Sequence, residues 1–188
     1  MTFADALPSL TNLKVLGLSN SNIIDDVFTT LASGIMSMET CNINRLYLDG
    51  NYIGDDGMLS LVVMLSSEHV KIEVLHLGNN LFTSDGLIVL ASAIESTETM
   101  HHLFLNDNEL FEDGVEALGN SLSYNRSLNL LSLPSCNITD EWLQLLLTGL
   151  SVNDNLESLH LFGNLLTDIG VELLIGTLEK HNNTLNDI

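Results

Sequence analysis

The side chains best able to do chemistry in this 188-residue chain are six histidines, two cysteines and 25 carboxylates. Adjacent carboxylates, as in Asp25-Asp26 and Asp55-Asp56, could serve acid/base catalysis or hold calcium. His76, His102 and Asp107 have the donor atoms that metal sites use. Whether any of these groups acts chemically depends on the elements that position them.

The carboxylates recur with the period of an internal repeat, and each set falls where a helix is expected to begin. A carboxylate there meets free N–H groups and the positive end of the helix dipole. We therefore interpret the acids as a solvated negative rim. The sequence contains no short His-x-x-x-His or Cys-x-x-Cys motif and no Gly-x-Ser-x-Gly elbow. We predict no catalytic residue, no cofactor and no metal. A pH-dependent interface stays open, because imidazole titrates at about pH 6.5.

The composition excludes some classes of function. Lys and Arg number 5 against 25 Asp and Glu, which gives a formal net charge of −20. Binding to nucleic acid or to an anionic membrane needs a basic surface, so neither partner is expected. The first residues lack the features of a signal peptide, and no apolar run approaches the roughly 18 residues of a membrane span. Two cysteines make no disulfide framework, so a reducing, cytoplasmic setting is the simpler expectation.

One pattern recurs six times: an apolar residue, two variable residues, Leu, one variable residue, Leu, two variable residues, commonly Asn, one variable residue and an apolar residue. The copies begin at residues 13, 43, 72, 100, 128 and 156, which are 28 to 30 residues apart. Residues 1–12 look like the second half of an earlier repeat, and residues 185–188 begin a truncated one. The spacing predicts a single repeat domain over residues 1–188.

Each copy changes its hydrophobic period halfway. Leucines at alternate positions of the first half predict a short strand with one face inward. In the second half, positions 16, 19, 20 and 23 are apolar or small in every copy, which is the spacing of one helix face. In the sixth copy these are Val171, Leu174, Ile175 and Leu178. Stacked units of this kind share one apolar core.

These features resemble leucine-rich repeats of the ribonuclease-inhibitor-like class, whose repeats of about 28 to 29 residues contain a full α-helix. The resemblance covers residues 13–188. Similar repeats occur in ribonuclease inhibitor, in the sensor domains of NOD-like receptors and in Ran GTPase-activating protein. The resemblance implies an α/β fold, a right-handed leucine-rich-repeat solenoid (horseshoe) with parallel strands on the concave face and α-helices on the convex face.

The recurring polar residues fit structural roles in such units. Asn51, Asn80, Asn108 and Asn164 share position 9, where an amide can satisfy backbone groups that are freed at the strand end. Cys136 takes this position in the fifth copy, and we expect no reactive thiol there. Threonines before the acids are expected to be helix N-caps, and glycines at position 15 should allow tight packing.

The variable residues of each strand point into the concavity. Tyr47, His76 and Phe104 share position 5 on adjacent strands, which predicts a contiguous row of rings. Exposed rings supply large contact area at low entropy cost. Tyr and Phe are also good strand residues, which is the alternative interpretation. We predict that a partner protein contacts Arg45, Tyr47, Asp49, Val74, His76, His102, Phe104, Asp107, His160 and Phe162.

The sequence therefore predicts a non-catalytic protein–protein interaction module, part of a larger scaffold, sensor or inhibitor-like protein. The acidic charge should favour a partner with a basic surface. The alternative is a GTPase-activating protein of the Ran GTPase-activating type, in which Arg45 would be the arginine. Neither end has an obvious polar capping unit. We therefore expect a fragment of a longer array, or a chain that is monomeric or self-associates weakly through strand edges.

Overall fold

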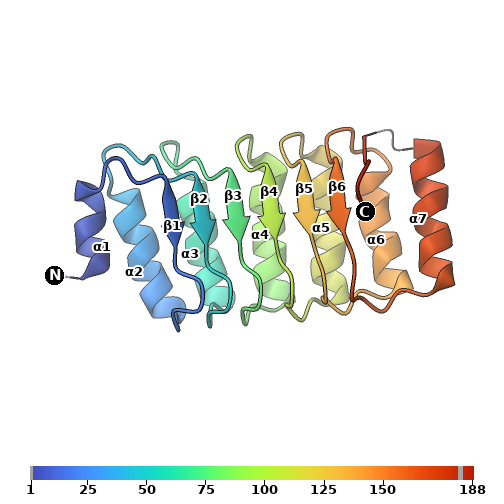
Figure 1. Ribbon diagram of the computed structural model, residues 1–188, viewed down its shortest axis with the longest axis horizontal. Helices are drawn as coiled ribbons and strands as arrows, with labels where there is room; N and C mark the ends of the chain where they lie inside the picture. The colour runs from blue at the N-terminus through green and yellow to red at the C-terminus, as the bar shows by residue number, and fades with distance from the viewer. Residues whose placement is uncertain (1, 182–183) are drawn as a thin grey trace.

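The computed structural model describes residues 2–181 and 184–188, and strands and helices alternate along them (Figure 1). The strands are β1 (Val15–Gly17), β2 (Arg45–Tyr47), β3 (Val74–His76), β4 (His102–Phe104), β5 (Leu130–Ser132) and β6 (Ser158–His160). The helices are α1 (Phe3–Ala6), α2 (Asp25–Met36), α3 (Asp55–Leu65), α4 (Ser84–Ser96), α5 (Glu112–Tyr124), α6 (Asp140–Leu150) and α7 (Asp168–His181), with a 3-10 turn over Leu7–Ser9.

The named strands form one parallel sheet in chain order, so each strand pairs with the same segment of the next repeat. Leu46 lies opposite Leu75, and Leu75 lies opposite Leu103. The sheet makes one layer and the helices make the other (Figure 1). The helices spread over a longer row than the strands, so the sheet lines the inner, concave side. This arrangement confirms the predicted α/β repeat solenoid.

The apolar core lies between the two layers because each strand and each helix turns one apolar face toward the other layer. In β3, Leu75 is fully buried, whereas Val74 and His76 on either side are partly exposed on the opposite face. In α4, Leu87 and Leu90 are fully buried. A single repeat could bury neither face alone, and neighbouring repeats complete the core.

The last helix departs from the prediction that every copy buries the same four positions. Val171 and Ile175 of α7 are 48% and 49% exposed. Their equivalents in the interior repeats pack between successive helices, but within the described residues no helix follows α7. The prediction was wrong for these two residues because their burial depends on a neighbouring repeat.

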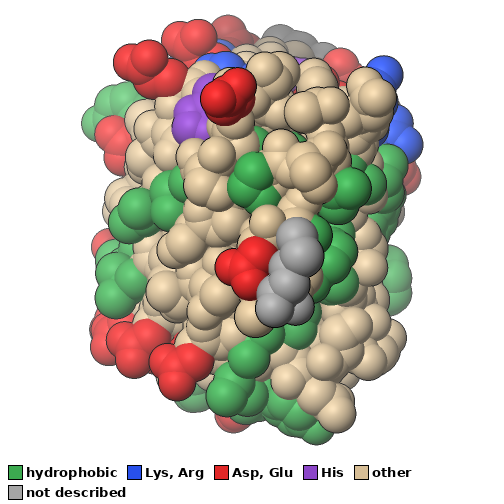
Figure 2. Space-filling model, turned by 90° about the vertical axis from the view of Figure 1, so that its left-hand side faces the viewer, with side chains coloured by type: hydrophobic (Ala, Val, Ile, Leu, Met, Phe, Trp, Pro, Cys, Tyr) green, Lys and Arg blue, Asp and Glu red, His purple; other side chains and the backbone are tan. Residues whose placement is uncertain are grey.

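The two ends of the sheet differ. At the C-terminal end, Asp187 pairs with Ser158 in a parallel bridge, and the N–H of Leu159 donates to the carbonyl of Asp187. At the N-terminal end, α1 has only four residues and leaves an apolar hollow of about 520 Å³. Phe3, Ile23 and Val27 are among the residues that line it. Figure 2 shows hydrophobic side chains at the surface of this end, together with acidic side chains, most of them toward its margins.

The helices approach one another unevenly. Gly119 of α5 and Gly149 of α6 lie so close that a Cβ on Gly149 would fall 1.7 Å from the carbonyl oxygen of Gly119. Backbone therefore touches backbone where these two helices meet, which a side chain at Gly149 would prevent. Gly34 makes a similar approach, since its Cβ would lie 2.8 Å from the carbonyl oxygen of Ala4.

Candidate functional site

The centre of the concave face carries a stack of three rings. The parallel register places Tyr47 opposite His76 and His76 opposite Phe104. The centroids of the Tyr47 and His76 rings are 4.5 Å apart, with an interplanar angle of 37°. The His76 and Phe104 rings are 3.9 Å apart and 15° from parallel. All three side chains remain partly exposed, and because His76 and Phe104 lie face to face, the concave face presents mainly the edges of the rings.

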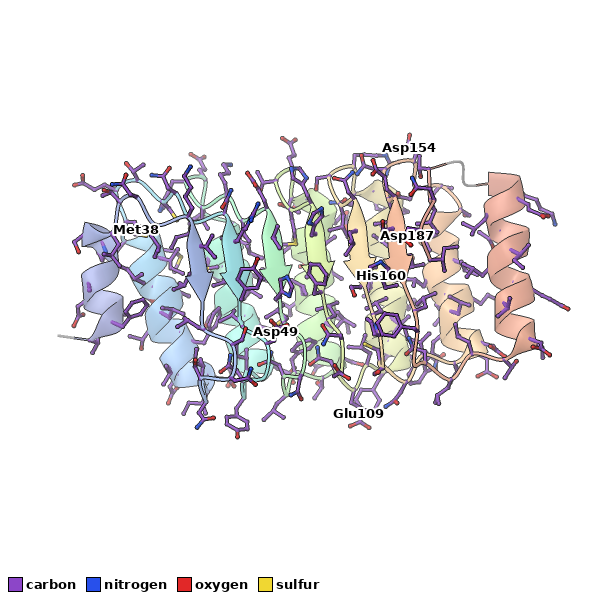
Figure 3. All side chains as sticks on the ribbon, in the orientation of Figure 1. Met38, Asp49, Glu109, Asp154, His160 and Asp187 are labelled. Atoms are coloured by element: carbon purple, nitrogen blue, oxygen red, sulfur yellow. The ribbon has the colours of Figure 1, made fainter. Side chains whose placement is uncertain are left out.

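Asp49 lies two residues after the end of β2 (Figure 3), next to His76 of the ring stack. Its Oδ1 accepts a hydrogen bond from the N–H of Gly78 at 3.0 Å, and its Oδ2 accepts one from the hydroxyl of Ser19 at 3.2 Å. The Nδ1 of His76 lies 3.6 Å from Oδ2. Burial alone would raise the pKa of Asp49, but His76 and the two hydrogen-bond donors outweigh burial and lower that pKa.

A second row runs beside the rings through Arg45, Val74 and His102, which the register aligns on neighbouring strands. Arg45 is exposed, and it forms no ion pair within residues 2–181 and 184–188. Burial lowers the pKa of His102, and the nearby positive charges of His101, Arg45 and His76 lower it further. A neutral His102 therefore extends the uncharged part of the face.

The remaining predicted contact residues lie outside this centre. Ser132 follows Phe104 in the ring row and is buried, so the row of exposed rings ends at Phe104. Beyond it, Nε2 of His160 is 3.2 Å from Oδ2 of Asp187 (Figure 3). Phe162 is 71% exposed, and Asp107 is exposed in a left-handed turn with φ of 57°. The structure thus gathers seven of the ten predicted residues around the rings and leaves His160, Phe162 and Asp107 apart.

An asparagine ladder holds the turns that follow the strands, as predicted. The amide of Asn51 donates to the carbonyls of Leu18 and Leu48, and its Oδ1 accepts from the backbone of Ser21 and Ile23. Asn80, Asn108 and Asn164 also donate to two successive repeats. In the fifth repeat, the thiol of Cys136 donates to the carbonyl of Leu105 at 3.3 Å. Burial raises the pKa of this thiol to about 11, so it is a structural donor.

Three of the predicted rim carboxylates link successive repeats. Asp55 accepts hydrogen bonds from the N–H and hydroxyl of Thr83 and from the N–H of Gly86. A Cβ on Gly86 would lie 2.6 Å from Oδ1 of Asp55, so glycine leaves room for the carboxylate. Asp25 and Asp140 make equivalent contacts to the next repeat. The interpretation as a purely solvated rim was wrong for these three, because their acceptors meet the helix start of the following repeat.

Sequence reasoning missed a second ladder in the loops that return from helix to strand. The amide of Asn125 donates to the carbonyl of Ile94, and its Oδ1 accepts from Ser127 and Leu128. Asn153 makes the same contacts one repeat later, with Leu122, Asn155 and Leu156. The signal was available, since these two asparagines share position 26 of their repeats.

The histidines and carboxylates of the concave face were also considered as metal ligands in the sequence analysis. In the part of the chain that the structure describes, no three His, Cys, Asp or Glu side chains gather into a metal-binding group. His76, His102 and Asp107 therefore do not form the ligand set that their donor types allowed. Over the same residues, no helix has the length and apolar character that crossing a membrane requires.

Comparisons with known proteins agree with this geometry. A family model described as "Leucine Rich repeat" matches residues 41–62 and 152–174. The chain is a leucine-rich repeat protein. Its curated relatives include NACHT, LRR and PYD domains-containing protein 3 from Bos taurus, 32% identical over 96 residues, and the Macaca mulatta and Homo sapiens proteins of the same name, each 34% identical over 96 residues. The match spans 51% of this chain but only 9% of each relative.

Solved structures of this leucine-rich repeat fold are also similar. The leiomodin-1 actin-binding site 2 aligns with a TM-score of 0.58 and 12% identity over 95% of this chain and 86% of that chain. The tropomodulin C-terminal domain of Caenorhabditis elegans aligns with a TM-score of 0.64 and 16% identity over 81% and 93% of the two chains. An internalin from Listeria monocytogenes aligns with a TM-score of 0.56 and 20% identity over 99% and 45%. These likenesses concern the fold.

Proposed function

We propose that residues 1–188 form one leucine-rich repeat domain of the ribonuclease-inhibitor-like class that binds a partner protein on its concave face and is not an enzyme. The ring stack of Tyr47, His76 and Phe104 is the observation that carries this proposal. Aromatic side chains on a rigid surface anchor interfaces because they lose little conformational entropy on binding. The leiomodin structure that shares this fold is named for an actin-binding site, so the fold is compatible with protein binding.

The charge of the chain supports a partner with a basic surface. The formal net charge is −20, and opposite charges accelerate association and set its salt dependence. The two cysteines are free, which suits a reducing, cytoplasmic setting. Within that setting the domain would serve as part of a scaffold, sensor or inhibitor-like protein, as a monomer or with weak association through strand edges.

The second function that the sequence left open finds no specific support. GTPase activation would need a positioned arginine at the reacting phosphate. Arg45 projects from β2 beside Val74 and His102 and has no hydrogen bond or ion pair that orients it within the described residues. We therefore propose binding alone.

Selection of a displayed peptide library on the immobilised protein tests this proposal. Peptides recovered on the wild type would be measured against Tyr47→Ala/Phe104→Ala, and we expect affinity to fall at least roughly tenfold. Leu59→Ala/Val63→Ala is the matched control, because both residues are exposed on the convex helix α3. Peptides that bind the ring variant and the wild type equally would contradict the proposal.

A further inference from the structure

An apolar strip runs along the edge of the solenoid where the chain leaves the strands and enters the helices, which is the lower edge in Figure 1. The apolar strip consists of Ile24, Tyr52 and Leu81, whose exposed fractions are 50%, 50% and 61%. Ile24 and Tyr52 pair in a parallel bridge, and the N–H of Leu81 donates to the carbonyl of Ile53. These backbone contacts hold the three exposed side chains on consecutive turns of the solenoid.

The fold does not require apolar side chains in the strip. Each strip residue lies next to a buried residue that fills the turn, as Ile53 does after Tyr52. The following repeat carries Glu109 at the position of Tyr52 and Leu81, and Asn108 before it still makes its ladder hydrogen bonds. Single exposed apolar residues are ordinary, but a contiguous group with a polar border is typical of an interaction site.

Carboxylates without a basic counterpart border the strip. Asp26, Asp56 and Asp85 are exposed at the starts of α2, α3 and α4, two to four residues after the strip residues. Glu109 is exposed beyond Leu81, at the same edge (Figure 3). Within the described residues no Lys or Arg pairs with these four carboxylates.

The absence of positive charge extends over the whole edge in these repeats. The segments that run from the strand ends to the middle of the next helices contain no Lys, Arg or His; they are residues 18–32, 48–62, 77–91 and 105–119. This part of the surface is therefore apolar along its centre and negative around it. Nucleic acid and anionic lipid, which carry negative charge, would be repelled from it.

We infer that the apolar strip is a second docking surface, separate from the ring stack, and that it receives a segment of a partner protein in which apolar side chains are flanked by Lys or Arg. The apolar side chains of the segment would cover Ile24, Tyr52 and Leu81, and burial of this area supplies attraction at contact. Its cations would face the bordering carboxylates, which steer the segment to the edge and fix its position. This surface is additional to the concave face of the proposed function.

Nuclear magnetic resonance with three synthetic peptides tests the inference on the labelled protein. A capped peptide of alternating lysine and leucine has both features. A lysine–serine peptide keeps only the charge, and a glutamine–leucine peptide keeps only the apolar side chains. We expect the lysine–leucine peptide to shift the amide resonances of Tyr52 and Leu81 in a saturable way. It should bind at least roughly tenfold more tightly than either of the other peptides.

Variants of the strip make the test specific. Tyr52→Ser/Leu81→Ser removes two of its three apolar side chains and should weaken the lysine–leucine peptide at least roughly tenfold. Leu165→Ser is the matched control, because Leu165 holds the same repeat position and is 60% exposed, but the preceding repeat has Asn137 there. Leu165→Ser should leave the affinity unchanged.

A second pair of variants tests the charged border. Asp56→Asn/Asp85→Asn removes two carboxylates beside the strip and should weaken the lysine–leucine peptide. Glu68→Gln/Glu98→Gln removes the same charge from exposed loops at the opposite edge of the same repeats and should weaken it less.

Four results would overturn the inference. They are binding that survives Tyr52→Ser/Leu81→Ser, a lysine–serine peptide that binds as tightly as the lysine–leucine peptide, binding that is lost in Tyr47→Ala/Phe104→Ala, and Tyr52 and Leu81 resonances that shift with protein concentration alone. The third result would place the peptide on the concave face, and the fourth would mean that a second copy of the chain covers the strip. The library selection on the ring variant tests the proposed function independently of these outcomes.

Discussion

The same repeat positions have different environments in the middle and at the end of the solenoid. Leu87 and Ala91 of α4 are almost completely buried, whereas Val171 and Ile175, their equivalents in α7, are about half exposed. All four side chains are apolar and lie on equivalent helix faces. The difference shows that a side chain in this protein is buried by the contact between two neighbouring repeats, and its position within one repeat is not sufficient. Stability should accordingly be a sum of repeat and junction contributions.

The largest expected difference between α4 and α7 is in the loss of stability when an apolar side chain is shortened to alanine. Leu87→Ala removes a fully buried side chain of α4 and should lower the free energy of unfolding by about 3 kcal/mol. Val171→Ala, at the equivalent position of α7, should lower it by less than about 1 kcal/mol because the side chain is about half exposed. Urea denaturation followed by circular dichroism measures both. Equal losses would mean that α7 is covered in solution.

The asparagine ladder should show the same contrast at a smaller scale. Asn108→Ala removes one buried donor from the carbonyls of Leu77 and Leu105 and leaves the buried N–H of Asn80 without its acceptor, which should lower the free energy of unfolding by about 2 kcal/mol. Asn164 makes the equivalent bonds in a partly exposed turn, so Asn164→Ala should lower it by about 1 kcal/mol. The same denaturation experiment compares the variants, and a larger loss for Asn164→Ala would contradict the contrast.

The second asparagine ladder, formed by Asn125 and Asn153 in the loops that return from helix to strand, can be extended to one more repeat. Thr97 takes the position of Asn125 one repeat earlier, with nearly the same backbone: φ and ψ are −74° and 138° at Thr97 and −66° and 137° at Asn125. In Thr97→Asn, the new Oδ1 should accept from the amides of Thr99 and Met100, and the new amide group should enter the groove beside Leu65. We expect a gain of about 1 kcal/mol in the free energy of unfolding. Thr97→Val, which cannot make these bonds, is the control and should not stabilise the protein.

The smallest expected effect concerns the pH dependence of stability. Burial in the central strand β4 lowers the pKa of His102, so the unfolded chain binds this proton more readily. The free energy of unfolding should therefore decrease as the pH falls below the ordinary histidine range of about 6.5. His102→Gln should lose this part of the decrease. Chemical denaturation at neutral and mildly acidic pH measures it, and an unchanged pH dependence in the variant would contradict the assignment.

The repeat period made most of the fold predictable. Because the copies are 28 to 30 residues apart, alignment alone placed Leu46, Leu75 and Leu103 in register and assigned Asn51 and Asn80 to the turns. The three stacked rings followed from the same alignment, although their angles and distances did not.

The contacts between repeats were less accessible to sequence reasoning. The link from Asp55 to Thr83 and Gly86 depends on how far one helix start is displaced from the next, which no pattern within a repeat encodes. Ser132 is buried because of the space that its neighbours fill, and residue type alone does not predict this. The same holds for the partial exposure of Val171, because no further helix covers that side of α7 within the described residues.

The backbone contact between Gly119 and Gly149 has a consequence for the shape of the binding surface. A solenoid bends because its helices, usually 8–10 Å apart, need more room than strands about 4.8 Å apart. Where α5 and α6 touch without intervening side chains, this mismatch shrinks and the arc straightens. We therefore expect the sheet next to α5 and α6 to curve less than it would in a solenoid with evenly spaced helices. A bulky side chain at Gly149 would push the two helices apart and so change the curvature of the concave face as well as the packing.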